Sequence, residues 1–147
     1  MTSKTSATLN DLIEVLNDGE SFYTEASAKP ELSAYRSLFQ RMARTKQAIA
    51  ADLKAQVVSH GDDAADGGTM FGSLRAKYTE LRSSFGKNPA KVYVDQLEQA
   101  EDSILEAFES HLKDTDNAEV RAILTRYMPE VLSAHNEMRD LKMRLAA

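Results

Sequence analysis

The chain contains no cysteine. This absence excludes disulfide bonds, thiolate zinc sites, iron–sulfur clusters and thiol catalysis. It fits a reducing compartment, so we expect a cytoplasmic protein. No apolar run reaches the roughly 18 residues that a membrane-spanning helix needs, so no membrane span is expected. Residues 1–10 are rich in Ser and Thr and lack an apolar stretch, so no signal peptide is expected either.

Basic residues are outnumbered by acidic ones. The sequence has 18 Lys and Arg against 23 Asp and Glu, which gives a net charge of -5. No basic cluster interleaved with aromatic residues offsets this acidity. A mildly acidic protein is poorly suited to coating a phosphate backbone, so we expect no nucleic-acid partner.

What the chain has throughout is apolar residues at helical spacing, with no alternating segment long enough for a strand. Its 147 residues fit one domain, 1–147, with residues 1–7 expected to be disordered. Thr8 followed by Asp11 predicts a helix start, and this first helix should end before Lys29–Pro30.

Three further long helices are predicted, together with a short one. The second long helix runs from Pro30 to His60, where Gly61 supplies a left-handed cap. The third follows Asn88–Pro89, and the fourth carries an apolar stripe from Val120 to Leu145, in which we expect Pro129 to cause a kink.

The connections predict the topology. The first and second helices, like the third and fourth, are joined by short turns, which favours two antiparallel hairpins. About 27 residues separate the second helix from the third, enough to run back along the bundle. An apolar stripe from Phe71 to Phe85 predicts a short fifth helix inside this crossover, so the second and third long helices should be parallel. The fold class is therefore an all-α four-helix bundle with a long crossover.

Each long stripe is interrupted once, near its centre, by a polar residue. These residues are Glu20, Thr45, Glu101 and His135. Burying an unpaired carboxylate is costly, so a metal, a proton, a histidinium or a hydrogen-bond network should compensate it. The pattern predicts a polar layer in the core, with Tyr23 and Tyr127 one turn away as core residues whose hydroxyls are satisfied.

Several segments resemble a known family. The stretches TLNDLIEVLNDGESFYTEA, QAEDSILEAF and AHNEMRDL are similar to those of a bacterial ferritin-like group, the domain of unknown function 2383. The resemblance covers nearly the whole chain. It implies the fold of the ferritin-like superfamily and no known activity.

The ligand set of ferritin-like di-iron proteins is incomplete here. In those proteins two helices each give a Glu, and the other two each give Glu-x-x-His. This sequence contains no Glu-x-x-His. One expected position reads Thr45, where the resembling group commonly has Glu, and His135 falls one residue late. At most Glu20, Glu101 and His135 match.

These residues leave three hypotheses. The first is a non-enzymatic structural or interaction protein without a cofactor, in which His135 lies as a cation between Glu20 and Glu101. The second is a metal-binding or redox protein that holds one divalent ion (Fe, Mn or Zn) through the same three residues. The third is a small-ligand binder that uses a gap in the core. Val15 and Phe22, beside the first stripe, extend the core or mark a homodimer seam.

Overall fold

The computed structural model describes residues 3–68 and 88–146. Every regular element in these two ranges is helical, which confirms the predicted all-α class. The elements are α1 (Lys4–Ser27), the 3-10 helix η1 (Pro30–Tyr35), α2 (Arg36–Ser59), α4 (Pro89–Asp114) and α5 (Ala118–Ala146). The short helix predicted over residues 71–85 lies outside the described residues.

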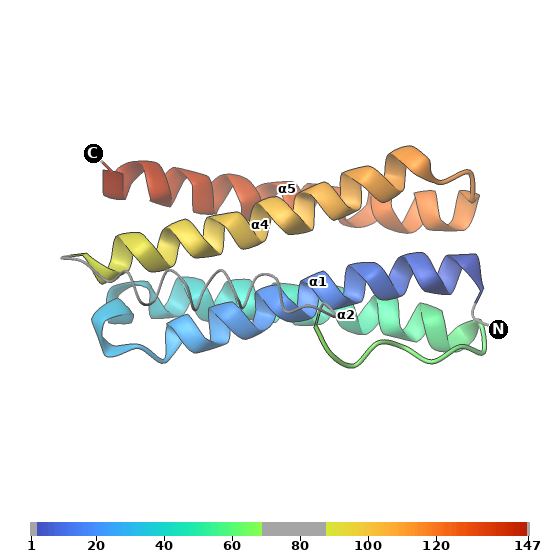
Figure 1. Ribbon diagram of the computed structural model, residues 1–147, viewed down its shortest axis with the longest axis horizontal. Helices are drawn as coiled ribbons and strands as arrows, with labels where there is room; N and C mark the ends of the chain where they lie inside the picture. The colour runs from blue at the N-terminus through green and yellow to red at the C-terminus, as the bar shows by residue number, and fades with distance from the viewer. Residues whose placement is uncertain (1–2, 69–87, 147) are drawn as a thin grey trace.

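The four long helices form two antiparallel hairpins, α1 with α2 and α4 with α5, which lie against each other mainly through α1 and α4 (Figure 1). In Figure 1 α2 and α4 run in the same direction, as the predicted crossover requires. Residues 61–68 begin this crossover by running back along α1. The side-chain amides of Asn10 and Asn17 hold them there, by donating to the carbonyl oxygens of Asp63 (3.1 Å) and Gly67 (2.9 Å).

Helix α1 begins at Lys4, one turn earlier than predicted. Ser3 is its N-cap, and the Ser3 hydroxyl accepts a hydrogen bond from the backbone N–H of Ser6 at 3.0 Å. Asp62 completes the cap by accepting from the Ser6 hydroxyl (2.6 Å) and from the Ser3 backbone N–H (3.2 Å). These bonds hold the pKa of the Asp62 carboxyl below its usual value. The expectation of disorder is therefore wrong for residues 3–7.

The predicted second helix is divided in two. Its first turns form η1, in which Leu32 has non-helical dihedrals (φ -112°, ψ 16°), and the α-helix begins only at Arg36. Leu32 is fully buried, so a tertiary contact accompanies this break. The predicted cap at the other end is confirmed, since Gly61 has a positive φ of 78°.

The later helix boundaries agree with the sequence pattern. Asn88 caps α4 by accepting from the backbone N–H of Lys91 at 3.3 Å. Helix α5 continues through Pro129 without a restart. None of the described helices combines the length and apolar character needed to cross a bilayer.

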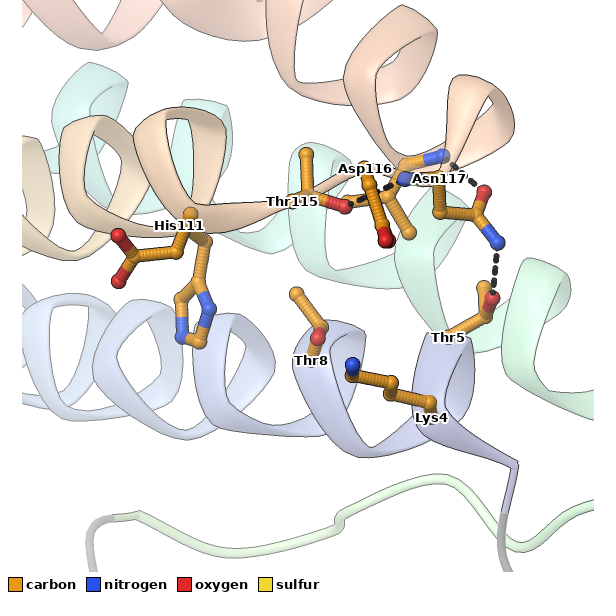
Figure 2. A pocket seen from close by; sticks show the side chains of 9 residues that line it. Lys4, Thr5, Thr8, His111, Thr115, Asp116 and Asn117 are labelled. Atoms are coloured by element: carbon orange, nitrogen blue, oxygen red, sulfur yellow. Dashed lines mark hydrogen bonds between the residues drawn. The ribbon is translucent and has the colours of Figure 1, made fainter.

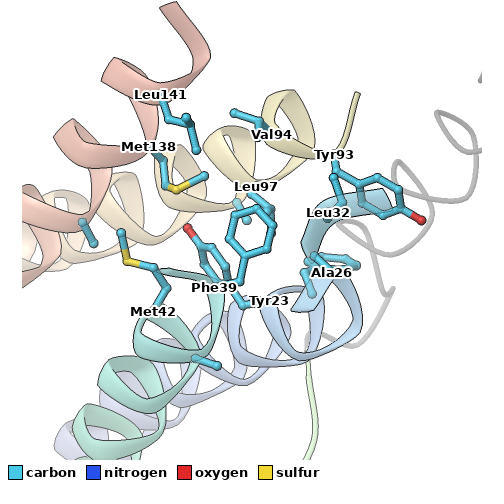
Figure 3. Close-up of a cluster of buried hydrophobic side chains, with 14 residues drawn as sticks. Tyr23, Ala26, Leu32, Phe39, Met42, Tyr93, Val94, Leu97, Met138 and Leu141 are labelled. Carbon is cyan, nitrogen blue, oxygen red and sulfur yellow. The ribbon is translucent and has the colours of Figure 1, made fainter. Parts of the chain in front are cut away.

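Two apolar clusters form the core. One is built mainly on the second half of α1, the start of α2 and the facing parts of α4 and α5 (Figure 3). The other lies toward the opposite end, around the α4–α5 turn. Phe22 belongs to the first cluster and Val15 packs against the second, so both extend the core, as one of the two hypotheses for them proposed. The largest fully buried side chains are Tyr23, Tyr93, Phe39, Phe108, Leu9, Leu12, Ile13, Leu16, Leu32, Met42, Leu53 and Leu97.

Gly19 allows the helices to approach closely at mid-bundle. A Cβ at this buried position would lie 2.9 Å from Ile104 Cδ1 and 3.1 Å from Lys46 Cδ. Normal carbon contacts begin at about 3.5 Å, so a methyl group there would have to push neighbouring side chains aside. The glycine lowers helix propensity but leaves room for the stem of Lys46.

Gly19→Ala and Ile104→Val should therefore be energetically coupled. Valine lacks the Cδ1 atom that lies closest to position 19, so Ile104→Val should reduce the steric cost of Gly19→Ala and let more of its gain in helix propensity, up to about 1 kcal/mol, appear in the double variant. We expect a favourable coupling of at least about 0.5 kcal/mol in a double-mutant cycle measured by urea unfolding. Strict additivity would show that the close approach has no energetic consequence.

Candidate functional site

A buried ion pair joins α2 to α4 in the middle of the bundle. Lys46 Nζ lies 2.6 Å from Glu101 Oε2, and the two side chains are only 3% and 1% exposed. The Tyr23 hydroxyl of α1 donates a hydrogen bond to the same carboxylate oxygen. Three helices thus contribute one charged or polar group each, and Oε2 of the carboxylate receives two donors from the protein.

Tyr23 also supports the cation. The ammonium of Lys46 lies 4.8 Å from the centroid of the Tyr23 ring, within the range of a cation–π contact. Burial, followed by the charge and hydrogen bond of Glu101, raises the pKa of Tyr23 well above its usual value. The phenol therefore keeps its proton and remains a donor.

The structure places Glu101 in the core, where the sequence pattern predicts it. The prediction that Thr45 lies in the core is wrong. Thr45 is partly exposed, and its hydroxyl donates to the carbonyl of Arg41 at 3.0 Å. Lys46 takes the core position instead. Both residues lie three or four positions from buried Met42 and Ile49, so the spacing alone does not distinguish them.

Glu20 does not belong to the buried layer either. It is partly exposed and lines a surface depression of about 280 Å³ together with Asn17, Lys54 and Gly67. Its neighbour Gly19 is the residue that faces the interior. The predicted Glu20–His135–Glu101 arrangement is therefore absent from the described structure.

His135 belongs to α5, and its side chain, which is 14% exposed, faces α4. Its Nε2 atom is 2.5 Å from Asp102 Oδ1 rather than beside Glu101. The hydroxyl of Tyr127 donates to Asp52 of α2, so the expectation that it is satisfied is met, although the residue is only partly buried.

A second polar cluster surrounds His135. Glu98 and Asp102, one turn apart on α4, each place a carboxylate oxygen within 4.8 Å of the other and of a ring nitrogen of His135. Lys142 of α5 approaches Glu98 Oε2 at 3.4 Å. Glu98 and Lys142 were not predicted as site residues from the sequence, although the spacing of Glu98 and Asp102, four residues apart, places them on one helix face.

A pocket of about 280 Å³ lies at the α4–α5 turn, against the start of α1 (Figure 2). Asn117, which lines it, is engaged where one helix ends and the next begins. Asn117 Oδ1 accepts from the backbone N–H of Val120 at 3.1 Å, and Asn117 Nδ2 donates to Thr5 Oγ1 at 3.2 Å. His111 lies 3.5 Å from Asp11 across the same α1–α4 face. The pocket is a capping network, and its geometry points to structural use.

A shallow groove of about 460 Å³ separates α2 from α5. The ion pair between Arg41 and Glu137, at 2.5 Å, bridges it, and their side chains are 54% and 40% exposed. The hydrogen bond that Arg41 donates to the carboxylate of Glu137 raises the pKa of Arg41. This groove is a surface feature and offers little support for a ligand site inside the core.

Comparisons with known proteins agree on the fold. A family model described as "Domain of unknown function (DUF2383)" matches residues 4–114. No curated protein matches the sequence. A mutant of Dps1 from Mycobacterium smegmatis has a similar structure, with a TM-score of 0.73, 12% identity and 96% of each chain covered. Dps1 is ferritin-like, so the predicted fold is confirmed, and at this identity the likeness shows the fold alone.

Proposed function

The chain belongs to this family, the domain of unknown function DUF2383, and we propose that it is a non-enzymatic ferritin-like bundle whose buried polar layer is structural. The observation that carries the proposal is the 2.6 Å contact between Lys46 and Glu101. The side-chain ammonium of Lys46 neutralises the buried carboxylate of Glu101.

Electrostatics supports this reading. A metal ion bound to Glu101 would have to displace the ammonium of Lys46 or lie beside it, and two cations so close repel strongly where little water screens them. The Tyr23 hydroxyl donates to the same Oε2 atom, which reduces the electron density available to a metal. The layer is therefore balanced in charge and hydrogen bonding as it stands.

The alternative, one divalent ion shared by Glu20, Glu101 and His135, finds no support in the geometry. Glu20 lines a surface depression, and His135 is paired with Asp102. Only Glu101 lies in the layer. A redox role for this set would need a rearrangement of two helices.

A bundle of this kind would act through its outer faces, as a structural or interaction protein. Leu132 and Met143 of α5 are exposed apolar side chains, at 45% and 63%, on such a face. Isolated exposed apolar residues are common, so they identify no particular partner. A cytoplasmic location is part of the proposal and rests on the sequence, whereas the homodimer seam loses its support because Val15 and Phe22 extend the core.

Ferrous oxidation tests the proposal. The full chain, purified without affinity tag or chelator, should oxidise Fe²⁺ in air no faster than buffer does. Glu101→Gln, checked for folding by circular dichroism, should bind as much Fe²⁺, Mn²⁺ and Zn²⁺ as the wild type. Catalysed oxidation that is lost in Glu101→Gln, or equimolar metal that is lost in the same variant, would contradict a structural layer.

A further inference from the structure

Three metal-binding side chains converge between α4 and α5, outside the buried layer. Glu98 and Asp102 extend from one face of α4, and His135 faces them from α5. One ligand atom from each lies within 4.8 Å of the other two. Helix geometry fixes the two carboxylates one turn apart, and hairpin packing brings the imidazole to them.

The cluster carries more negative charge than its nearest cation balances. Two carboxylates at this distance repel each other, and Lys142 approaches only one of them, at 3.4 Å, with a side chain that is 40% exposed. Glu98 is largely buried, at 8% exposed, which adds to the cost of its charge. Glu101 differs, because its cation, Lys46, is both closer and buried.

We propose that Glu98, Asp102 and His135 bind one exchangeable divalent ion of the Zn²⁺ class. Two carboxylate oxygens and one imidazole nitrogen suit an ion of intermediate softness, and Zn²⁺ binds three such ligands plus a water. Mg²⁺ and Ca²⁺ prefer sites built from oxygen ligands alone. This inference goes beyond the proposed function, because it concerns a different set of residues.

The metal-free geometry explains what binding changes. His135 Nε2 and Asp102 Oδ1 lie 2.5 Å apart, a hydrogen-bond distance. Ligands of a tetrahedral zinc ion lie about 3.3 Å apart, given bonds of about 2.0 Å. Binding therefore breaks this hydrogen bond, separates the pair slightly and draws Glu98 in from Lys142. The ion would link α4 to α5 and stabilise the second hairpin.

Calorimetric titration of the chelator-treated full chain with ZnCl₂ tests the site. We expect one equivalent to bind, and the affinity to fall at least about tenfold in Asp102→Asn and in His135→Gln. His60→Gln is the matched control, because His60 pairs with the carboxylate of Glu119 at 2.9 Å outside this cluster. Its affinity should equal that of the wild type.

The variant Lys142→Met distinguishes a metal site from a purely structural pair of His135 and Asp102. Removing the competing ammonium should raise the Zn²⁺ affinity several-fold, while a structural pair predicts no change. Zn²⁺ should also raise the melting temperature of the wild type but not that of His135→Gln. Absence of Zn²⁺ binding, or equal binding in wild type and His135→Gln, would overturn the proposal and leave the Lys46–Glu101 layer unaffected.

Discussion

Lys46→Met is expected to lower the free energy of unfolding by about 3–5 kcal/mol, because it leaves the carboxylate of Glu101 buried without its cation. Methionine preserves the length of the stem, so packing beside Gly19 changes little. The side chain of Glu101 is 1% exposed, and water cannot replace the lost ammonium without opening the core. Urea unfolding followed by circular dichroism measures the loss.

Lys54→Met is the matched control for this substitution. Lys54 lies two turns further along α2 and is partly exposed. Its replacement should change the free energy of unfolding by no more than about 0.5 kcal/mol. Equal effects of the two substitutions would show that the buried pair contributes nothing specific.

Tyr23→Phe should cost about 1.5–3 kcal/mol, the range for a hydrogen bond to a charged group, since Glu101 loses its second donor. Tyr127→Phe breaks the same kind of bond, to Asp52, but should cost clearly less. The side chain of Asp52 is 34% exposed and has Arg126 at 3.7 Å, so water and a cation remain available to it. The two variants compared by urea unfolding isolate the effect of burial. Similar losses would contradict the picture of a dry layer.

Tyr23→Phe should also change how the free energy of unfolding depends on pH at alkaline pH. The pKa of Tyr23 is raised by burial and by Glu101, so the folded protein binds a proton that the unfolded chain releases. Its contribution to stability is complete below the unfolded pKa of about 10 and is lost as the pH rises beyond it. Stability against pH should therefore fall less steeply above pH 10 in Tyr23→Phe than in the wild type. Parallel curves would contradict the assignment.

Helical periodicity predicts most of the fold because four amphipathic stripes and two short turns permit few arrangements. The start of α1 is different. Asp62, far along the chain, completes the cap at Ser3, and local sequence carries no sign of that contact. The break at Leu32 likewise accompanies the burial of that side chain. Both depend on tertiary structure.

The candidate site is less predictable. Glu101 follows from its central position on a stripe, but the helical spacing predicted Thr45 at the core position that Lys46 occupies, and spacing alone does not separate these two neighbours. Lysine is rarely buried without a partner. Here the partner is Glu101 itself. The sequence did contain a signal for this pair. A buried Glu101 requires a cation, and Lys46 is the lysine that lies in phase with the apolar stripe of α2. Gly19 lowers helix propensity and lies beside Lys46, at the same height in the bundle as the ion pair.

The central claim is that Lys46, Glu101 and Tyr23 form a self-sufficient structural layer. The direct test is the free energy of unfolding of the variant Tyr23→Phe/Lys46→Met/Glu101→Met, in which all three polar groups are replaced together. Buried ion pairs replaced by apolar residues of similar volume often leave stability unchanged or raised. We predict a cooperatively folded protein within about 1 kcal/mol of the wild type or more stable. A triple variant as unstable as Lys46→Met alone would contradict the account.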